Sequence, residues 1–234
     1  MDSPVMQALG KVADLMWLNI LTLICCIPII TVGPALTALH YMALKIVRDE
    51  ECYITKGFFK SFKENFLQAT AIWLIMLVVI AMLVGDFLII KYSGLSFPKA
   101  LQVIIIAIAI LFLFMATFVF PVLARFVNTI RQTIKNAFLM SIMQFPKTIL
   151  MIIISIIPPT VFLLIPQAIP LVFLFGLSLP AWLSAKLYNK FFQKIEDQIL
   201  AANPPEVETD ENGEDVRIFK DELDETLAGG SAEQ

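Results

Sequence analysis

Few side chains inside the apolar segments of this sequence could do chemistry. The candidates are Asn19, Asp86 and His40, the only histidine among 234 residues. Ionisable groups within a bilayer are costly, which makes them candidates for substrate or proton pathways. Asp86 has two interpretations: it reaches the outer interface or pairs with another helix near Lys91, or it takes part in transport. His40 is either a packing residue or a ligand, and Asn19 is expected to hydrogen-bond between helices.

Other kinds of chemistry lack their residue sets. The sequence has no Gly-x-x-x-x-Gly-Lys-Ser/Thr phosphate loop and no His-Glu-x-x-His zinc motif. A single histidine gives no Ser/His/Asp set. Cys25 and Cys26 lie in an apolar run, and no ligands flank Cys52, so neither a disulfide framework nor a metal site is expected. We predict no enzyme activity, no cofactor and no metal, and no nucleic-acid partner, because basic residues are scattered along the chain.

The elements that must position these residues are apolar helices. The chain is 59% hydrophobic, with a mean hydropathy of +0.82. Residues Thr148–Ala185 contain no charged residue and no histidine. One membrane-spanning helix needs about 20 apolar residues, so this run is long enough for two helices. Chain in contact with lipid must satisfy its own backbone hydrogen bonds, which favours helices. The apolar helices are expected at 66–90, 100–124, 148–165 and 169–187.

The first apolar region leaves two alternatives. Its uncharged run, Leu15–Leu39, is interrupted by Pro28, Gly33 and Pro34, which predict a helix break. The region is one kinked span or a hairpin of Met6–Ile27 and Pro34–Val47. The predicted fold class is therefore an all-α polytopic membrane protein with five to six hydrophobic helices. At membrane depth the break needs partners within the protein, and the candidates for this role are Thr31 and Thr37.

Two polar segments have amphipathic spacing. In Lys56–Phe66, phenylalanines recur every four residues and lysines lie on another face; in Arg125–Lys147, Arg131 and Lys135 are neighbours on one face. Such elements either anchor a protein at the lipid headgroups or dock a cytosolic partner. The candidate interaction surface consists of Lys56, Phe58, Lys60, Phe62, Lys63, Arg131 and Lys135.

Charge predicts topology and domain division. Lysine and arginine concentrate in segments 45–65, 125–147 and 186–194, so these segments and the C-terminus are expected in the cytosol and the protein in the plasma membrane. The N-terminus lies outside for a single first span and inside for a hairpin. Residues 204–234 hold 11 acidic residues and two basic ones. We therefore predict a transmembrane domain over 1–202 and an acidic, mostly disordered cytosolic tail over 203–234.

Three stretches carry a family resemblance: Leu18–Leu23, Cys26–Tyr41 and Phe58–Phe66. The second contains Pro-Ile-Ile-Thr-Val-Gly-Pro, and the third reads Phe-Phe-Lys-Ser-Phe-Lys-Glu-Asn-Phe. Over residues 5–200 the chain resembles the YesL-like family of bacterial membrane proteins, a family of unknown function. Members are often encoded beside ABC-type carbohydrate uptake systems in Gram-positive bacteria.

The resemblance implies an accessory or regulatory component of carbohydrate uptake, with the lipid bilayer and ABC transporter subunits or a cytosolic protein as partners. The alternative is a small transporter or permease component in its own right. Permease subunits carry a Glu-Ala-Ala…Gly coupling loop, which the nearest stretch, Asn136–Met140, does not match. A membrane enzyme acting on lipid-linked substrates is a third class. Neither the sugar nor the oligomeric state follows from the sequence.

Overall fold

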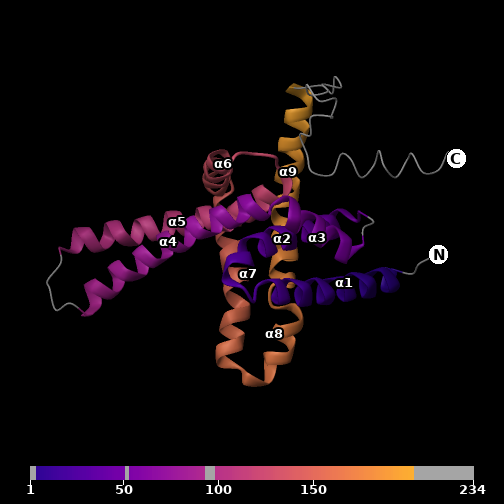
Figure 1. The fold of residues 1–234 in the computed structure, drawn as a ribbon, viewed down its shortest axis with the longest axis horizontal. Coiled ribbons are helices and arrows are strands. Elements are labelled where there is room, and N and C mark those ends of the chain that lie inside the picture. The colour runs from indigo at the N-terminus through magenta and orange to yellow at the C-terminus, as the bar shows by residue number, and fades with distance from the viewer. Residues whose placement is uncertain (1–3, 51–52, 93–97, 203–234) are drawn as a thin grey trace.

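The structure, a computed structural model, describes residues 4–50, 53–92 and 98–202. These residues form nine α-helices and two 3-10 turns, and they contain no strand (Figure 1). Four segments are long and apolar enough to cross a membrane, or five when one bent pair counts as a single span. The predicted polytopic helical fold is confirmed. The acidic tail, 203–234, lies outside the described residues, as does Cys52.

The first apolar region forms two helices. Helix α1 covers Pro4–Cys25 and α2 covers Val32–Arg48. Lys11, near the start of α1, forms an ion pair with Asp49, which follows the end of α2. The two helices are therefore antiparallel, as in the hairpin alternative.

Proline chemistry explains the break between α1 and α2. Pro28 has an extended backbone (φ −75°, ψ 126°), and the 3-10 turn η1 (Ile29–Thr31) follows it. The Thr31 hydroxyl donates to the carbonyls of Cys25 at 2.7 Å and Pro28 at 2.8 Å, groups that a continuous helix would have paired.

The expectation that other helices enclose the break was only partly right. Residues 27–30 are exposed, because the turn lies at the edge of the helix packing, whereas Gly33 and Pro34 are buried in the first turn of α2. Thr37 donates to the Gly33 carbonyl within α2 and does not reach the break.

Helix α3 (Ile54–Glu64) packs on α2. Phe58 is fully buried in this contact. Gly57 allows the close approach, since a Cβ at this position would lie 2.7 Å from the Met42 sulfur.

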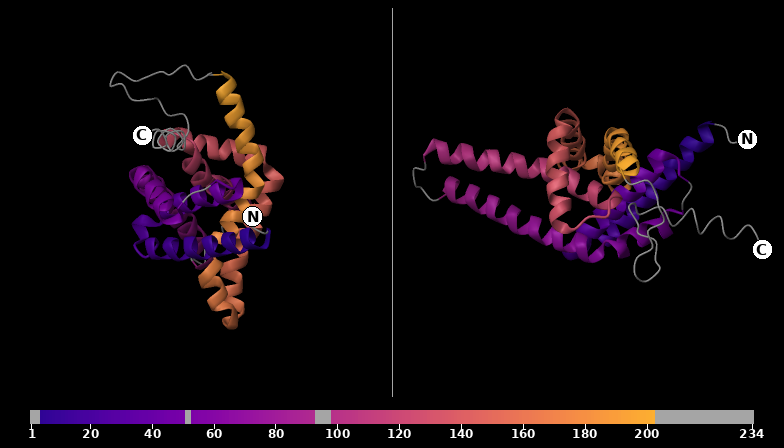
Figure 2. Two further views of the ribbon diagram at one scale, coloured as in Figure 1. Left: turned by 90° about the vertical axis from the view of Figure 1, so that its right-hand side faces the viewer. Right: turned by 90° about the horizontal axis from the view of Figure 1, so that it is seen from above.

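Helices α4 (Phe66–Tyr92) and α5 (Lys99–Arg125) form a long hairpin that projects from the remaining helices (Figures 1 and 2). In the most apolar 18-residue stretch of α4 only 11% is buried within the protein, and in that of α5 only 17%. The corresponding share for the stretch that contains α2 is 67%. The hairpin therefore exposes apolar side chains on most of its surface, as expected for contact with lipid.

Helix α6 (Ile130–Met143) begins at a capping box, in which Thr129 and Gln132 exchange side-chain and backbone hydrogen bonds. Helix α7 (Phe145–Leu164) follows almost directly. Pro146 lies in the first turn of α7, where a proline needs no amide donor.

The last apolar region departs from the predicted helix over 169–187. After the turn η2 (Pro166–Ala168), the chain forms α8 (Ile169–Phe175), breaks, and continues as α9 (Ser178–Ala202). The axes of α8 and α9 differ by 48°. Helix α9 extends beyond the uncharged run because Tyr188 and Phe192 pack in the core while its lysines stay outside.

Helix α2 lies at the centre of the fold. It contacts α1, α3, α4, α5 and α9, which surround it. Helices α7 and α9 run across the direction of the α4–α5 hairpin (Figures 1 and 2). The core therefore sits where these two groups of helices meet around α2.

Candidate functional site

A cavity of about 650 Å³ lies beside α2, between α5, α7 and the broken pair α8–α9. Small-molecule sites are usually about 300–1,000 Å³. Apart from two serines, one threonine and one histidine, the lining side chains are apolar, and none of the lining residues is charged. The polar lining residues are His40, Thr117, Ser155 and Ser184.

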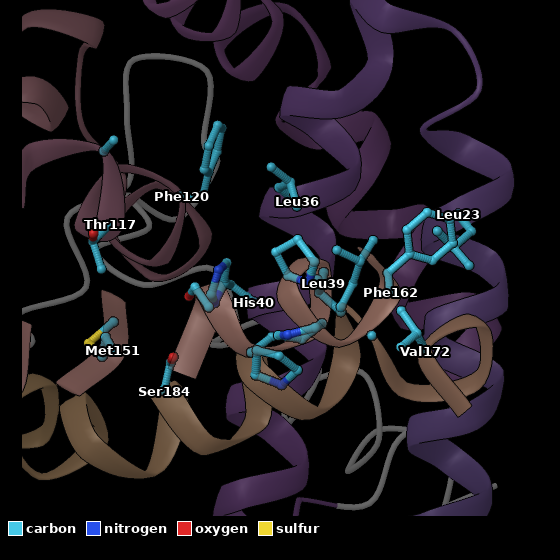
Figure 3. A pocket seen from close by; sticks show the side chains of 18 of the residues that line it. Leu23, Leu36, Leu39, His40, Thr117, Phe120, Met151, Phe162, Val172 and Ser184 are labelled. Atoms are coloured by element: carbon cyan, nitrogen blue, oxygen red, sulfur yellow. The ribbon is translucent and has the colours of Figure 1, made fainter. Parts of the chain in front are cut away.

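The two ends of the cavity differ in polarity. Figure 3 shows His40, Thr117 and Ser184 toward one end and Leu23, Phe162 and Val172 toward the other. The helices separate polar from apolar residues in the same way. On α7 the polar Ser155 comes before the apolar Phe162, and on the α8–α9 pair the polar Ser184 comes after the apolar Val172. The cavity is therefore amphipathic along its length.

His40 joins the polar end of the cavity to a buried aromatic cluster. Its Nδ1 lies 3.5 Å from the Tyr188 hydroxyl, which is a long hydrogen-bond contact. The Tyr188 ring packs against Phe192, with centroids 4.6 Å apart, and against Phe118 at 6.4 Å. Phe192 in turn meets Phe126 edge-on at 5.2 Å. These four rings, the aromatic cluster, are almost fully buried and fill the space beyond the cavity.

A buried ionic cluster lies on the far side of these rings. Glu196 of α9 accepts hydrogen bonds from both Arg48 of α2 (2.8 and 3.1 Å) and Arg125 of α5 (2.9 and 3.1 Å). Arg48 also donates to Asn189 at 2.8 Å. Glu196 is only 8% exposed and Arg125 only 9%. Two guanidinium groups that hydrogen-bond to one buried carboxylate stabilise its charged form. This cluster ties together the three helices that meet beneath the cavity.

Asn19 of α1 satisfies the backbone at the break between α8 and α9. Its side-chain oxygen accepts from the amides of Leu177 at 2.8 Å and Ser178 at 2.9 Å, and its nitrogen donates to the Phe173 carbonyl at 2.6 Å. Asn19 is fully buried. Gly176 and Leu177 line the cavity, so the break forms part of its wall.

The structure therefore brings two of the three polar candidates to one site. His40 lines the cavity and Asn19 holds the helix break in its wall. Asp86 lies elsewhere, exposed on the projecting part of α4. Gly33 has a packing role: a Cβ there would lie 2.7 Å from the Cβ of Trp73 on α4. Pro28 lies at the exposed turn outside the cavity.

The candidate interaction surface is only partly a surface. Lys56, Lys63, Arg131 and Lys135 are exposed, and Lys60 is half-buried. Phe58 is fully buried between α3 and α2 and so does not belong to a surface, and Phe62 is partly buried against the same core. The α3 aromatic face packs on protein because Gly57, which has no side chain, lets α3 approach Met42 of α2 closely.

Sequence reasoning missed the ionic cluster. Arg48 and Arg125 counted only as basic residues of cytosolic segments, and Glu196 lies in a lysine-rich helix that was not predicted. Their pairing depends on three helices that are far apart in the chain, so no local spacing of residues in the sequence predicts it. One signal was present: Arg125 is the last residue of an apolar helix and has no acidic neighbour in sequence.

No metal site is evident within the described residues, where no three or more His, Cys, Asp or Glu side chains come together to hold an ion.

Residues 15–87 match a family described as a protein of unknown function, DUF624. The match covers α1 from Leu15, α2, α3 and most of α4, about a third of the chain. It includes Asn19, His40 and Arg48. No curated protein and no solved structure matches the chain. The narrower YesL-like resemblance stays a prediction.

Proposed function

We propose that this membrane protein is an accessory or regulatory component that binds a partner protein through the exposed basic faces of α3 and α6. The observation that carries the proposal is the orientation of α3. An interfacial anchor inserts its aromatic face into lipid, but the aromatic face of α3 packs on α2 and Phe58 is fully buried. Lys56 and Lys63 stay exposed on the outer face. This face is therefore available to a partner.

The partner class comes from the resemblance. YesL-like proteins are often encoded beside carbohydrate importers of the ABC type, and we extend the proposal to such an importer. The cavity supports an accessory role over direct sugar binding, since a sugar needs many hydrogen-bond partners and the lining offers four polar side chains.

Co-purification from native membranes, followed by mass spectrometry, tests the proposal. Transporter ATPase or permease subunits should be recovered with the wild-type protein. The double charge reversals Lys56→Glu/Lys63→Glu and Arg131→Glu/Lys135→Glu should weaken recovery, while Lys99→Glu at the start of α5 should not.

Headgroup binding would also respond to charge reversal, because each basic residue near an anionic surface contributes about 1 kcal/mol. The comparison is therefore repeated in nanodiscs of neutral lipid. Equal partner binding by wild type and both double variants in neutral lipid would exclude these faces as the binding surface.

A second candidate, a small transporter, is favoured by one observation. The wall of the cavity contains a broken helix, α8–α9, whose freed backbone groups are held by Asn19. Discontinuous helices form the substrate sites of many transporters. Substrate flux into liposomes that contain this chain alone would support this candidate over the accessory role.

A further inference from the structure

We propose that the cavity is a binding site for a neutral lipid that has one hydrocarbon chain and a hydroxyl-bearing headgroup, such as a monoacylglycerol. The proposal concerns the cavity alone. It holds whether the protein is an accessory component or a transporter, because it does not depend on the surfaces of α3 and α6.

The lining selects for hydrocarbon. Eighteen of the 22 lining residues have apolar side chains or none. A ligand rich in polar groups would leave those groups without partners, which is unfavourable in an apolar site. An alkyl chain needs no such partners and gains from burial.

The ends of the cavity select for an amphiphile. The neutral groups of His40, Ser184 and Thr117 gather toward one end, and Leu23, Phe162 and Val172 lie toward the other (Figure 3). A headgroup hydroxyl both donates and accepts, which matches serine, threonine and imidazole partners. The chain of the ligand would then lie along α8 and the end of α7.

Charge placement selects for a neutral headgroup. None of the lining residues is charged. Arg48 and Arg125 both hydrogen-bond to Glu196 beyond the aromatic cluster, and the buried Lys45 pairs with Glu50 at 3.8 Å. The Tyr188 hydroxyl contacts His40 of the lining and Phe118 packs against the Tyr188 ring, and both rings are at most 1% exposed. A phosphate or carboxylate in the cavity would therefore lack a counter-charge.

The apolar end provides an entry route from the membrane. Phe162, Ile169 and Phe173 line the cavity, yet they are 50%, 42% and 58% exposed on the outside of the protein. They belong to a segment of the chain without a charged residue. A lipid that enters from the bilayer headgroup-first can therefore bring its headgroup to the polar end while its chain stays along this apolar end, and it can leave by the same route.

The test is photolabelling of the full chain in nanodiscs with a monoacylglycerol that carries a diazirine on its acyl chain. Mass spectrometry locates the label. We expect labelled residues in α7, α8 and the start of α9, and competition by unlabelled monoacylglycerol. Ala181 lines the cavity and is 4% exposed, so Ala181→Phe should obstruct part of the cavity and lower labelling at least tenfold. The matched control is Ala81→Phe, at an exposed position of α4, which should label as wild type does.

A second variant keeps the test decisive if Ala181→Phe folds poorly. Ser184→Ala removes one hydroxyl and little volume, and it should weaken competition by monoacylglycerol about fivefold, the value of one hydrogen bond. Competition by an alkane of the same chain length should not change. Labelling spread evenly along α4, α5 and α7, or equal competition by a fatty acid carrying a charged carboxylate, would overturn the proposal.

Discussion

The side-chain oxygen of Asn19 accepts a hydrogen bond from the backbone amide of Leu177, although the two residues are 158 positions apart in the sequence. The first helix thus completes the backbone pairing of the last apolar segment. Apolar surroundings make an unpaired amide or carbonyl costly. The break between α8 and α9 can therefore persist only while α1 is in place.

Replacing Asn19 by leucine should destabilise the protein. The change keeps the size of the side chain but leaves the amides of Leu177 and Ser178 and the carbonyl of Phe173 without their partner. Each buried group left unpaired costs about 1–3 kcal/mol. Thermal unfolding in detergent measures the loss. Thr160→Val is the control, because that hydroxyl bonds within an exposed turn of α7. Equal melting temperatures for both variants would contradict the role assigned to Asn19.

Glu196→Gln should cost more than a typical surface charge change. The variant leaves Arg48 and Arg125 close together without their carboxylate, and removing one partner of a buried ion pair costs about 3–5 kcal/mol. Asp197→Asn, at the next, exposed position, should have little effect. The measurement is again thermal unfolding in detergent.

The coupling within the ionic cluster can be separated from general damage to α9. Adding Arg48→Met to Glu196→Gln removes one of the two unpaired cations, so the double variant should be more stable than the sum of the single changes predicts. Strict additivity would mean that Arg48 and Glu196 do not interact in the folded protein.

Two glycines should respond in opposite ways to alanine. At Gly33 a Cβ would lie 2.7 Å from the Trp73 Cβ, so Gly33→Ala must separate α2 from α4 and lower the melting temperature. At Gly85 nothing lies within 4 Å of the added Cβ. Alanine favours helix over glycine by up to about 1 kcal/mol, so Gly85→Ala should leave the melting temperature unchanged or raise it slightly. Similar losses in both variants would show that α2 and α4 do not approach closely at Gly33.

The C-terminus is expected in the cytosol, because lysine and arginine concentrate in segments 45–65, 125–147 and 186–194. A reporter fused after Gln234 that is active only in the cytosol should give a signal. The N-terminus should lie on the same side, since α1 and α2 form a hairpin. The same reporter placed before Met1 tests this, and opposite signals at the two ends would exclude the hairpin topology.

Hydrophobic patterning was sufficient to predict most of the fold. Long apolar runs predicted α4, α5 and α7 close to their observed limits, and the Pro28–Pro34 segment predicted the break after α1. The break at Gly176 was missed because it depends on a tertiary partner, Asn19, that replaces lost helix hydrogen bonds. The length of α9 was missed because an amphipathic helix end looks like a polar loop when only uncharged runs are counted.

The candidate site was less predictable. His40 and Asn19 could be selected because polar residues are rare in apolar segments, whereas Asp86 was selected for the same reason and lies on an exposed surface. Ser155, Thr117 and Ser184 carry no local signal, since hydroxyl side chains are common in membrane helices. Which of them share a cavity is decided by helix crossings that a single sequence does not specify.

The length of the α4–α5 hairpin sets how the protein must sit in a bilayer. Each of its helices has 27 residues and is therefore about 40 Å long at 1.5 Å per residue. The hydrocarbon core is only about 30 Å thick. To be immersed along their whole length, both helices must tilt by about 40° from the membrane normal, at the upper end of what membrane helices adopt. Since α7 and α9 run across the hairpin (Figure 1), the same placement inclines them in the opposite sense. A thinner or thicker membrane would change this inclination and with it the angle at which the cavity mouth meets the lipid chains.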